Sequence, residues 1–249
     1  DIVLFNRINK KLFLTKEGEE LLVKAKEIDR DLNDFESLAK KEDLNPIIKI
    51  GATITFGAFL IPNYTIELSK QVPALIPKFV IDKPKDLEEK ITDGTLDFAF
   101  EEGNISNKKI RTIKIGEDEL IAICAPTFDV PEKLKLEELI NYDLLLRESG
   151  NPSRRMLDYQ LAIKGIKLGA PRLESVSNNV IISMAINGLG IGILPSAVAR
   201  RAINNGFVRR IELDTPLKRN LYLICHKGKK FNKLTKKAFL IAQNILVKK

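Results

Sequence analysis

The sequence predicts an α/β protein in which helices cover both faces of parallel sheets. From Ile47 onward, short apolar runs typical of strands alternate with longer amphipathic runs typical of helices. A length of 249 residues allows one large domain or two small ones, and an apolar fraction of 44% is ordinary for a folded chain. Because Trp is absent and aromatic residues are few, we expect cores built mostly from Ile, Leu, Val and Ala.

Residues 1–14 have the pattern of a hairpin, because two short apolar runs flank a basic turn from Asn6 to Lys11. Thr15 then offers an N-cap for a long helix that should end near Leu44, since Asn45-Pro46 stops a helix. The apolar residues of this helix alternate spacings of four and three, a seam typical of helices that pair. The seam comprises Leu21, Ala25, Ile28, Leu32, Phe35 and Ala39. The alternative is an amphipathic helix packed on its own domain.

The elements after this helix follow from their apolar patterns and from the turn residues between them. Strands are expected at residues 47–53, 78–83, 95–103, 119–126, 144–150, 171–177, 189–195 and 221–228. Helices are expected at residues 55–71, 84–94, 130–143, 151–166, 178–188, 196–206 and 233–249. The uncharged stretch 178–199 is long enough to raise a membrane span, but Asn187, its glycines and Pro195 divide it into helix, turn and strand. We therefore expect no membrane span, and no secretion signal opens the sequence.

Composition limits the chemistry. The formal charge of +8 favours a polyanion such as nucleic acid or an anionic membrane, and a lysine-rich surface without a special partner is equally expected. Two Cys and one His exclude a disulfide framework and a Cys/His zinc site, and they weaken any Ser-His or Cys-His mechanism. We expect no metal and no cofactor. Cys124 and Cys225 lie in strand-like runs, where we expect buried, reduced thiols of a cytosolic protein.

Two strand ends are candidate ligand sites. The stretch GATITFGAFLIP carries Thr53 and Thr55 where a strand ends and a helix begins, so these hydroxyls could cap the helix or touch a ligand. The stretch RESGNPSRRML adds hydroxyl, amide and guanidinium donors that suit a small carboxylate, phosphate or sulfate. Its donors are Ser149, Asn151, Ser153 and Arg154. An ordinary loop with a Pro-initiated helix is the alternative.

Two further stretches have weaker claims. In NGLGIGILP the glycines follow a helix and open a strand, the reverse of a dinucleotide fingerprint, so we reject nucleotide binding. Gly188 and Gly190 more simply end the helix and let the strand pack closely. Glu101 and Glu102 end a strand before Gly103, and we expect them to line a cleft, because nothing in the sequence supplies the second group that acid–base catalysis needs.

Several segments in fixed order resemble the LysR-type transcriptional regulators. LFNRINKKLFLTKEGEELL resembles the wing and linker helix of that family, with its L-T-x-x-G motif at Leu14, Thr15 and Gly18. IKIGATITFGAFLIP resembles the first strand and helix of the effector domain, ITDGTLDFAFEEG its G-x-L-D run, and NGLGIGILPSAVA its G-x-G-I-x-x-L-P signature. The resemblance covers essentially the whole chain.

The resemblance implies a fold and a domain order. The fold would be α/β, with two Rossmann-like lobes of the type 2 periplasmic-binding-protein fold after a long linker helix and a remnant of a winged helix-turn-helix. Residues 1–14 would form the wing, 15–46 the dimerising linker helix, 47–122 and 221–249 lobe I, and 123–220 lobe II. Cys124 and Cys225 would lie on or beside the two crossing strands, where they could be neighbours.

The resemblance also implies roles for particular residues. A small ligand in the interlobe cleft would contact Thr53, Thr55, Glu101, Ser149, Asn151, Ser153, Asn178, Leu194 and Pro195. Arg7, Lys10 and Lys11 of the wing would touch the DNA backbone, while the helices that read DNA would lie upstream of Asp1. The seam would form a homodimer or homotetramer. Glu101 and Glu102 add negative charge near the expected anion site, which leaves the sign of the ligand open.

Three functions follow, in order of preference. The first is a cytoplasmic LysR-type DNA-binding regulator that senses a small anionic metabolite, with promoter DNA as partner and no membrane partner. The second is a periplasmic-type solute-binding protein, which shares the two-lobe architecture. The third is an enzyme on this fold, which we do not expect because His226 has no obvious partner and no G-x-S-x-G motif occurs.

Overall fold

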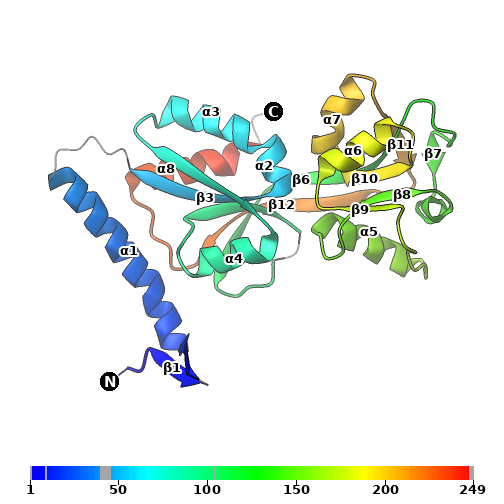
Figure 1. Cartoon of the computed structure of the whole chain (residues 1–249). Coiled ribbons are helices and arrows are strands. Elements are labelled where there is room, and N and C mark those ends of the chain that lie inside the picture. The colour runs from blue at the N-terminus through cyan, green and yellow to red at the C-terminus, as the bar shows by residue number, and fades with distance from the viewer. Residues whose placement is uncertain (1, 9, 40–45, 104, 247–249) are drawn as a thin grey trace. The chain divides into compact units, whose positions relative to one another are not determined.

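The structure is a computed structural model that describes residues 2–8, 10–39, 46–103 and 105–246. It divides into two compact units (Figure 1). Unit 1 comprises Asp1–Glu101, Ile105–Ile115 and Tyr222–Lys249, and unit 2 comprises Glu102–Asn104 and Gly116–Leu221. Two strands, β6 (Ile110–Cys124) and β12 (Leu217–His226), contribute residues to both units. The functional division into wing, linker helix and lobes stays a prediction.

The N-terminal residues form the hairpin expected from their pattern. Strands β1 (Phe5–Ile8) and β2 (Lys11–Leu14) pair antiparallel, and helix α1 (Lys16–Ala39) follows. The Thr15 hydroxyl accepts a hydrogen bond from the Gly18 N–H at 2.9 Å and donates one to the Val3 carbonyl at 2.7 Å, which confirms the expected cap. A Cβ on Gly18 would lie 2.2 Å from the Leu4 carbonyl oxygen, so this close approach of helix and hairpin requires glycine. The predicted helix end near Leu44 lies outside the described residues.

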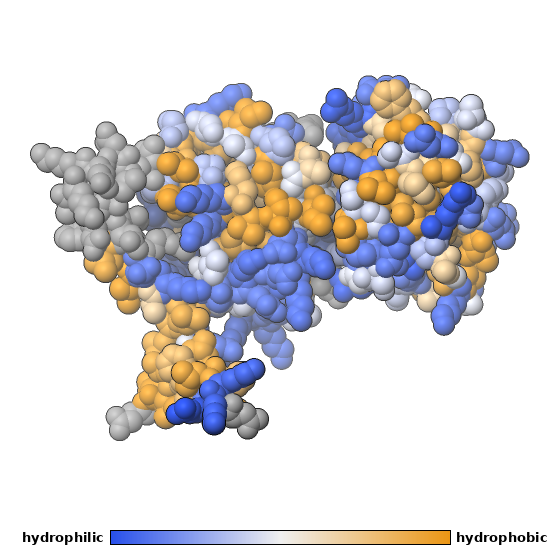
Figure 2. Space-filling view, viewed as in Figure 1, coloured by the Kyte–Doolittle hydropathy of each residue, from blue (hydrophilic) through white to orange (hydrophobic). Residues whose placement is uncertain are grey.

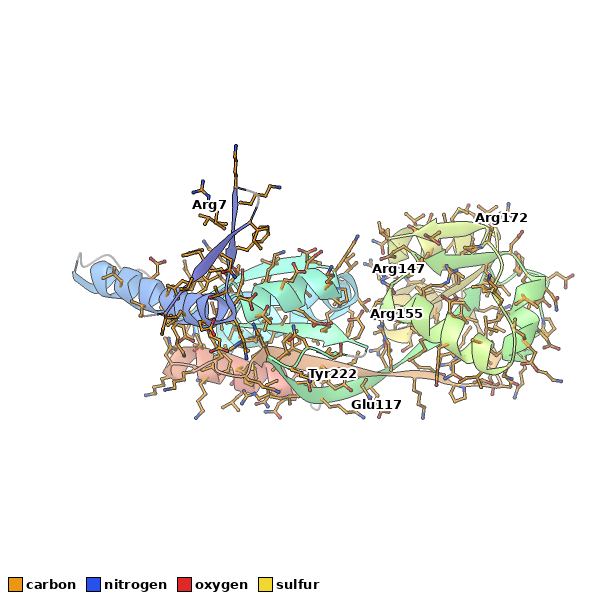
Figure 3. The ribbon with its side chains drawn as sticks, turned by 90° about the horizontal axis from the view of Figure 1, so that it is seen from below. Arg7, Glu117, Arg147, Arg155, Arg172 and Tyr222 are labelled. Atoms are coloured by element: carbon orange, nitrogen blue, oxygen red, sulfur yellow. The ribbon has the colours of Figure 1, made fainter. Side chains whose placement is uncertain are left out.

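The hairpin presents both charge and apolar surface. Arg7, Lys10 and Lys11 are exposed, and Figure 3 shows Arg7 pointing away from the hairpin. Apolar side chains also cover part of the hairpin and of α1 (Figure 2). Those more than half exposed are Ile2, Val3, Phe5, Ile8, Leu12, Ile28 and Leu32. A surface of this kind is uncommon on a monomer and is typical of an interaction site.

Unit 1 is built on parallel strands with helices on both faces. Strand β3 (Ile47–Thr53) lies between β4 (Ile76–Asp82) and β5 (Phe98–Glu102) and pairs parallel with both. Helices α3 (Ile61–Gln71) and α8 (Lys233–Asn244) cover one face, and α4 (Pro84–Thr92) covers the other (Figure 1). The predicted helix 55–71 is two helices, α2 (Ile54–Phe59) and α3, because the chain restarts at Ile61 with Pro62 in the first turn.

The two faces of unit 1 have different cores. Under α4 the core is aliphatic and includes Leu87, Ile91 and Leu96. On the opposite face aromatic rings pack at centroid separations of 5.3–6.5 Å, and they include Phe56, Tyr64, Phe98, Phe100 and Phe239. Among the described residues the buried core is mostly Ile, Leu, Val and Ala, as expected, and its few aromatic residues are concentrated on this face.

Unit 2 repeats the layered plan. Its strands run in the order β6, β10 (Ile191–Pro195), β8 (Leu144–Arg147) and β9 (Leu173–Ser175), with β11 (Arg209–Leu213) beside β6. Along β6, Leu120, Ala122 and Cys124 face one core, while Ile121 and Ile123 face the other. Helix α5 (Pro152–Ile163) closes the first core, and α6 (Asn178–Ile186) and α7 (Ser196–Asn204) close the second. Burial on both faces explains the continuous apolar runs in these strands.

Several sequence expectations need correction. The sheet is mixed, because β6 pairs antiparallel with both β10 and β11. Residues 130–143 form no α-helix; Lys133–Leu134 is a short strand, β7, that pairs with β11, and Leu136–Asn141 is one 3₁₀ segment, η1. Strand β6 begins at Ile110 rather than 119, and β11 was not expected. The first half of β6 and all of β11 contain several charged residues, which conceals them from a search for apolar runs.

The cysteines are free, and both are fully buried as expected. Cys124 lies in unit 2 and Cys225 in unit 1, so that the two could be neighbours stays a prediction. Within the described part of the chain, no helix has the length and apolar character that a membrane crossing would need. Among the same residues, no group of three His, Cys, Asp or Glu side chains is placed to hold a metal ion.

Candidate functional site

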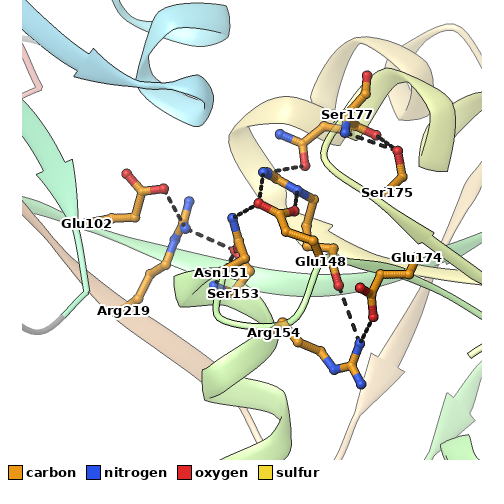
Figure 4. Close-up of polar contacts among 11 residues, drawn as sticks. Glu102, Glu148, Asn151, Ser153, Arg154, Glu174, Ser175, Ser177 and Arg219 are labelled. Carbon is orange, nitrogen blue, oxygen red and sulfur yellow. Dashed lines mark hydrogen bonds and ion pairs between the residues drawn. The ribbon is translucent and has the colours of Figure 1, made fainter. Parts of the chain in front are cut away.

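Buried polar side chains gather in unit 2 where β8 ends and helices α5 and α6 begin (Figure 4). The Arg147 guanidinium, 2% exposed, closes β8 and donates to both carboxylate oxygens of the neighbouring Glu148 at 2.8 and 3.1 Å. It also donates to the amide oxygen of Asn178 at 3.2 Å. The charged end of a buried strand is thereby joined to the first residue of α6.

The side-chain amide of Asn178 has its oxygen bonded and its nitrogen available. Its oxygen accepts from Arg147, whereas its Nδ2 is buried and has no hydrogen-bond partner among the described residues. The residue before it, Ser177, makes no side-chain cap for α6. The backbone N–H groups of the first helical turn are therefore also available, and a helix N-terminus favours negative charge. An unmet buried donor beside such an end is an arrangement that an oxygen-bearing ligand can satisfy.

The start of α5 is held by a second polar cluster. The Asn151 side chain caps α5 by accepting from the Ser153 N–H at 2.9 Å. The Ser153 hydroxyl, in a residue 3% exposed, accepts from a terminal nitrogen of Arg219 at 3.2 Å. Arg219 also forms ion pairs with Asp118 at 2.9 Å and with Glu102 at 3.4 Å, while its Nε is buried without a partner among the described residues.

The charges in this site largely offset one another. Glu148 pairs with Arg147, and Glu102 and Asp118 both pair with Arg219. The negative charge of Glu102, which left the sign of the ligand open in the sequence, is thus paired with the Arg219 guanidinium inside unit 2. The groups here that suit an anion are therefore uncharged donors, chiefly the Asn178 amide and the N-terminus of α6, and the site has no excess positive charge.

The remaining predicted contacts are distributed over both units. Thr53, Thr55 and Glu101 are buried in unit 1, with Thr53 at the N-cap position of α2 but without a side-chain capping bond. In unit 2, Leu194 and Pro195 are buried at the end of β10, and Ser149 is exposed. The structure brings together Asn151, Ser153 and Asn178 of the predicted set around Arg147 and Arg219.

Arg154, another expected donor, is directed elsewhere. Its guanidinium donates to Asp158 at 3.0 Å, to the Arg147 carbonyl at 3.4 Å and to Glu174 at 3.5 Å. These contacts tie α5 to β8 and β9, so Arg154 holds the loop together rather than offering its charge to a ligand.

Arg147, Asp118 and Arg219 were not singled out from the sequence. In LKRNL, Leu217, Arg219 and Leu221 are buried while the two residues between them are exposed. A charged residue in the inward phase of an alternating strand is a signal that could have revealed Arg219.

No nucleophile is prepared for catalysis among the groups considered from the sequence. Burial raises the pKa of Cys124 and Cys225, which disfavours their thiolates. Burial and the nearby Lys109 lower the pKa of His226, whose Nδ1 accepts from the Gly228 N–H at 3.0 Å. The imidazole is thus engaged in its own turn.

The chain matches a known protein family and is similar to named regulators. The model of the LysR substrate binding domain matches residues 41–240. The chain is 27% identical over 234 residues to the HTH-type transcriptional regulator YeiE of Escherichia coli, covering 92% of this chain and 78% of that one. It is also 27% identical over 237 residues to the HTH-type transcriptional activator CmpR of Synechocystis, covering 93% and 77%.

Solved structures agree with this likeness. An OxyR mutant of Corynebacterium glutamicum superposes with a TM-score of 0.72 at 22% identity, covering 98% of this chain and 79% of that one. The Synechocystis CcmR regulatory domain in complex with 2-PG gives 0.71 at 18% identity, covering 82% and 97%. These likenesses confirm the predicted α/β fold of the periplasmic-binding-protein type. The linker helix and winged helix-turn-helix remnant stay predictions.

Proposed function

Because the chain belongs to the LysR substrate-binding domain family, we propose that it is the effector-sensing part of a DNA-binding transcriptional regulator of the LysR type. The match over residues 41–240, together with relatives that are transcriptional regulators, supports this proposal most directly. A ligand that binds one conformation of the protein more tightly than another increases the population of that conformation. This change would alter how the regulator binds promoter DNA. The regulator would act in the cytoplasm.

The regulatory role is tested in cells and in solution. Transcripts of genes that the protein controls should change when its gene is deleted. Binding of the purified regulator to the promoters of those genes should change when its ligand, identified by mass spectrometry of the co-purified protein, is added. Promoter binding that is the same with and without this ligand would contradict a sensing role.

The ligand is proposed to be a small anion held by the Asn178 amide and the start of α6. Replacing Asn178 with Asp removes the free donor and adds a negative charge without changing side-chain size. We expect affinity for an anionic ligand to fall roughly 10- to 100-fold, as for loss of a hydrogen bond to a charged group. Calorimetric titration with the co-purified ligand, or with 2-PG and inorganic phosphate as probes, measures this change.

Asn187→Asp is the matched control. Asn187 is exposed, and its amide donates to the Ser183 carbonyl of its own helix at 2.8 Å. The Asn187→Asp variant should leave the affinity for the ligand unchanged. Tighter binding in Asn178→Asp would mean that the ligand is cationic, and equal affinity in both variants would move the ligand away from α6. That Thr53, Thr55 and Glu101 also contact the ligand stays a prediction.

Pairing through α1 is the second part of the proposal. One side of the helix packs on the rest of unit 1, where Val23 is buried and Lys26 bonds to Asp93 and Thr95. The predicted seam lies elsewhere on α1, with Leu21 and Ile28 exposed. The side chains of Phe35 and Ala39 lie outside the described residues, whereas Ala25 and Leu32 are also exposed. These exposed seam residues support a helix that packs on its own unit and also pairs with a second copy.

Ile28→Lys tests this pairing. Ile28 is 68% exposed, so lysine should not disturb the fold of one chain, but it would place a charge in the seam. We expect the dissociation constant of the dimer to rise about tenfold or more, measured by sedimentation equilibrium. Ile66→Lys, on the exposed side of α3, is the control and should not change it. An unchanged dimer in Ile28→Lys would place the contact on another surface.

The two other functions have less support. The relatives are transcriptional regulators, so a solute-binding protein for transport is not favoured. We also propose that the chain is not an enzyme. The site pairs its charged groups with one another, and the thiols and His226 are held in their own cores and turns.

A further inference from the structure

The positive charge of the chain is unevenly distributed along its sequence. No Asp or Glu follows Asp214, whereas Lys residues recur through the end of β12 and helix α8. Elsewhere in the described chain, Lys and Arg side chains commonly form ion pairs with Asp or Glu, as in Lys90–Asp82 and Arg172–Asp143. The formal charge of +8 is therefore concentrated in the C-terminal part of unit 1.

Four lysines there define what we call the α8 basic face: Lys227, Lys230, Lys233 and Lys236. All four are exposed, and none forms an ion pair with any residue that the structure describes. Nitrogen-tipped side chains project outward from α8 in Figure 3. Because no acid offsets these charges, they attract a partner with several negative charges.

Neighbouring contacts fix the backbone that carries this face. The Lys227 N–H donates to the Lys109 carbonyl at 2.9 Å, and Lys229 is buried in an ion pair with Asp97 at 2.9 Å. The Asn232 side chain caps α8 by accepting from the Thr235 N–H at 2.9 Å. Lys233 and Lys236, three residues apart, share one side of the helix. The four lysines thus lie within a stretch of ten residues whose backbone these contacts hold in unit 1.

The surface suits a phosphate backbone better than a lipid bilayer. A helix that enters a membrane interface must offer a broad apolar side, but the apolar side of α8, with Ala238, Phe239 and Ala242, is buried in the core of unit 1. Lysines present compact charges without a fixed hydrogen-bond pattern, and phosphate contacts carry no sequence information directly. We propose that the α8 basic face binds the phosphate backbone of double-stranded DNA independently of base sequence, a second DNA contact that rests on the proposed function as a DNA-binding regulator.

The test compares two variants of the full chain with equal changes in charge. The face variant carries Lys227→Gln, Lys230→Gln, Lys233→Gln and Lys236→Gln. The control variant carries the same change at Lys70, Lys78, Lys83 and Lys85, which are exposed on other elements of unit 1. Fluorescence anisotropy with a short DNA duplex of arbitrary sequence, over a range of salt concentrations, measures affinity. Thermal unfolding confirms that both variants fold.

We expect the face variant to bind DNA about tenfold more weakly or worse, with the slope of log affinity against log salt flattened by about 0.9 for each lysine that touches a phosphate. The control variant should lose much less of its affinity for DNA. Equal losses in both variants would reduce the effect to net charge and overturn the proposal, as would unchanged binding in the face variant. Binding to vesicles that contain anionic lipid but not to the duplex would also overturn it.

This outcome is separable from the proposed function. If the face variant loses its affinity for arbitrary DNA while the regulator carrying the same changes still responds to its ligand, both proposals stand. If the protein regulates no gene but the chain binds arbitrary DNA through this face, only the regulatory proposal fails.

Discussion

Arg219→Met is expected to lower the free energy of unfolding by about 3–5 kcal/mol, the usual loss when one partner of a buried ion pair is removed. The Arg219 side chain is 1% exposed and contacts Glu102 and Asp118, which are 3% and 5% exposed. Removing the guanidinium would leave both carboxylates buried without their cation, and it would also remove the donor to the Ser153 hydroxyl. Urea denaturation followed by circular dichroism measures the loss.

Arg210→Met is the matched control for this variant. Arg210 is also an arginine on a strand of unit 2, and it pairs with Glu119 at 2.9 Å, but the two side chains are 45% and 31% exposed. Because solvent screens such pairs, the loss should be below about 1 kcal/mol. Arg219→Met combined with Glu102→Gln and Asp118→Asn should recover part of the stability, since no charge is then left unpaired. A loss in Arg219→Met no larger than in Arg210→Met would show that water already solvates this cluster.

The importance of Arg219 shows which part of the site could not be predicted from the sequence. Its partners Ser153 and Asp118 lie 66 and 101 positions away along the chain, so only the fold brings them together. Asn151 and Ser153 were predictable because a strand end followed by Asn-Pro-Ser is a local signal for a capped helix. Local chemistry thus revealed the start of α5, whereas the cation that its hydroxyl contacts required the tertiary structure.

The strands also differ in how well the sequence predicted them. β3, β8 and β10 are mostly apolar and mostly buried because helices cover both of their faces, and their positions were predicted closely. The first half of β6 reads RTIKIGEDE, with exposed charged residues between inward ones, and it was missed. β11, which reads RRIEL, was missed for the same reason. Strands with one solvated face require a search for alternation rather than for apolar runs.

Glycine placement was predicted more securely, and it leads to a second large effect. The order helix, glycines, strand at residues 187–195 indicated packing rather than nucleotide binding. In the structure Gly188 ends α6 with a φ of 70°, and Gly190 adopts a φ of 150° immediately before β10. A Cβ on Gly190 would lie 2.2 Å from the Asp143 carbonyl oxygen, whereas a Cβ on Gly188 would meet nothing within 4 Å.

Gly190→Ala should therefore lower the free energy of unfolding by about 3 kcal/mol or more, because an unfavourable φ adds to a clash with backbone that cannot rotate away. The Asp143 carbonyl also accepts from the Ile191 N–H at 2.8 Å, so moving it would disturb the pairing of β10 with β8. Gly188→Ala is the control and should cost about 1 kcal/mol, since only its left-handed conformation opposes the methyl group. Equal losses of about 1 kcal/mol in urea denaturation would mean that β10 shifts to accept the methyl group and that close packing does not require glycine at 190.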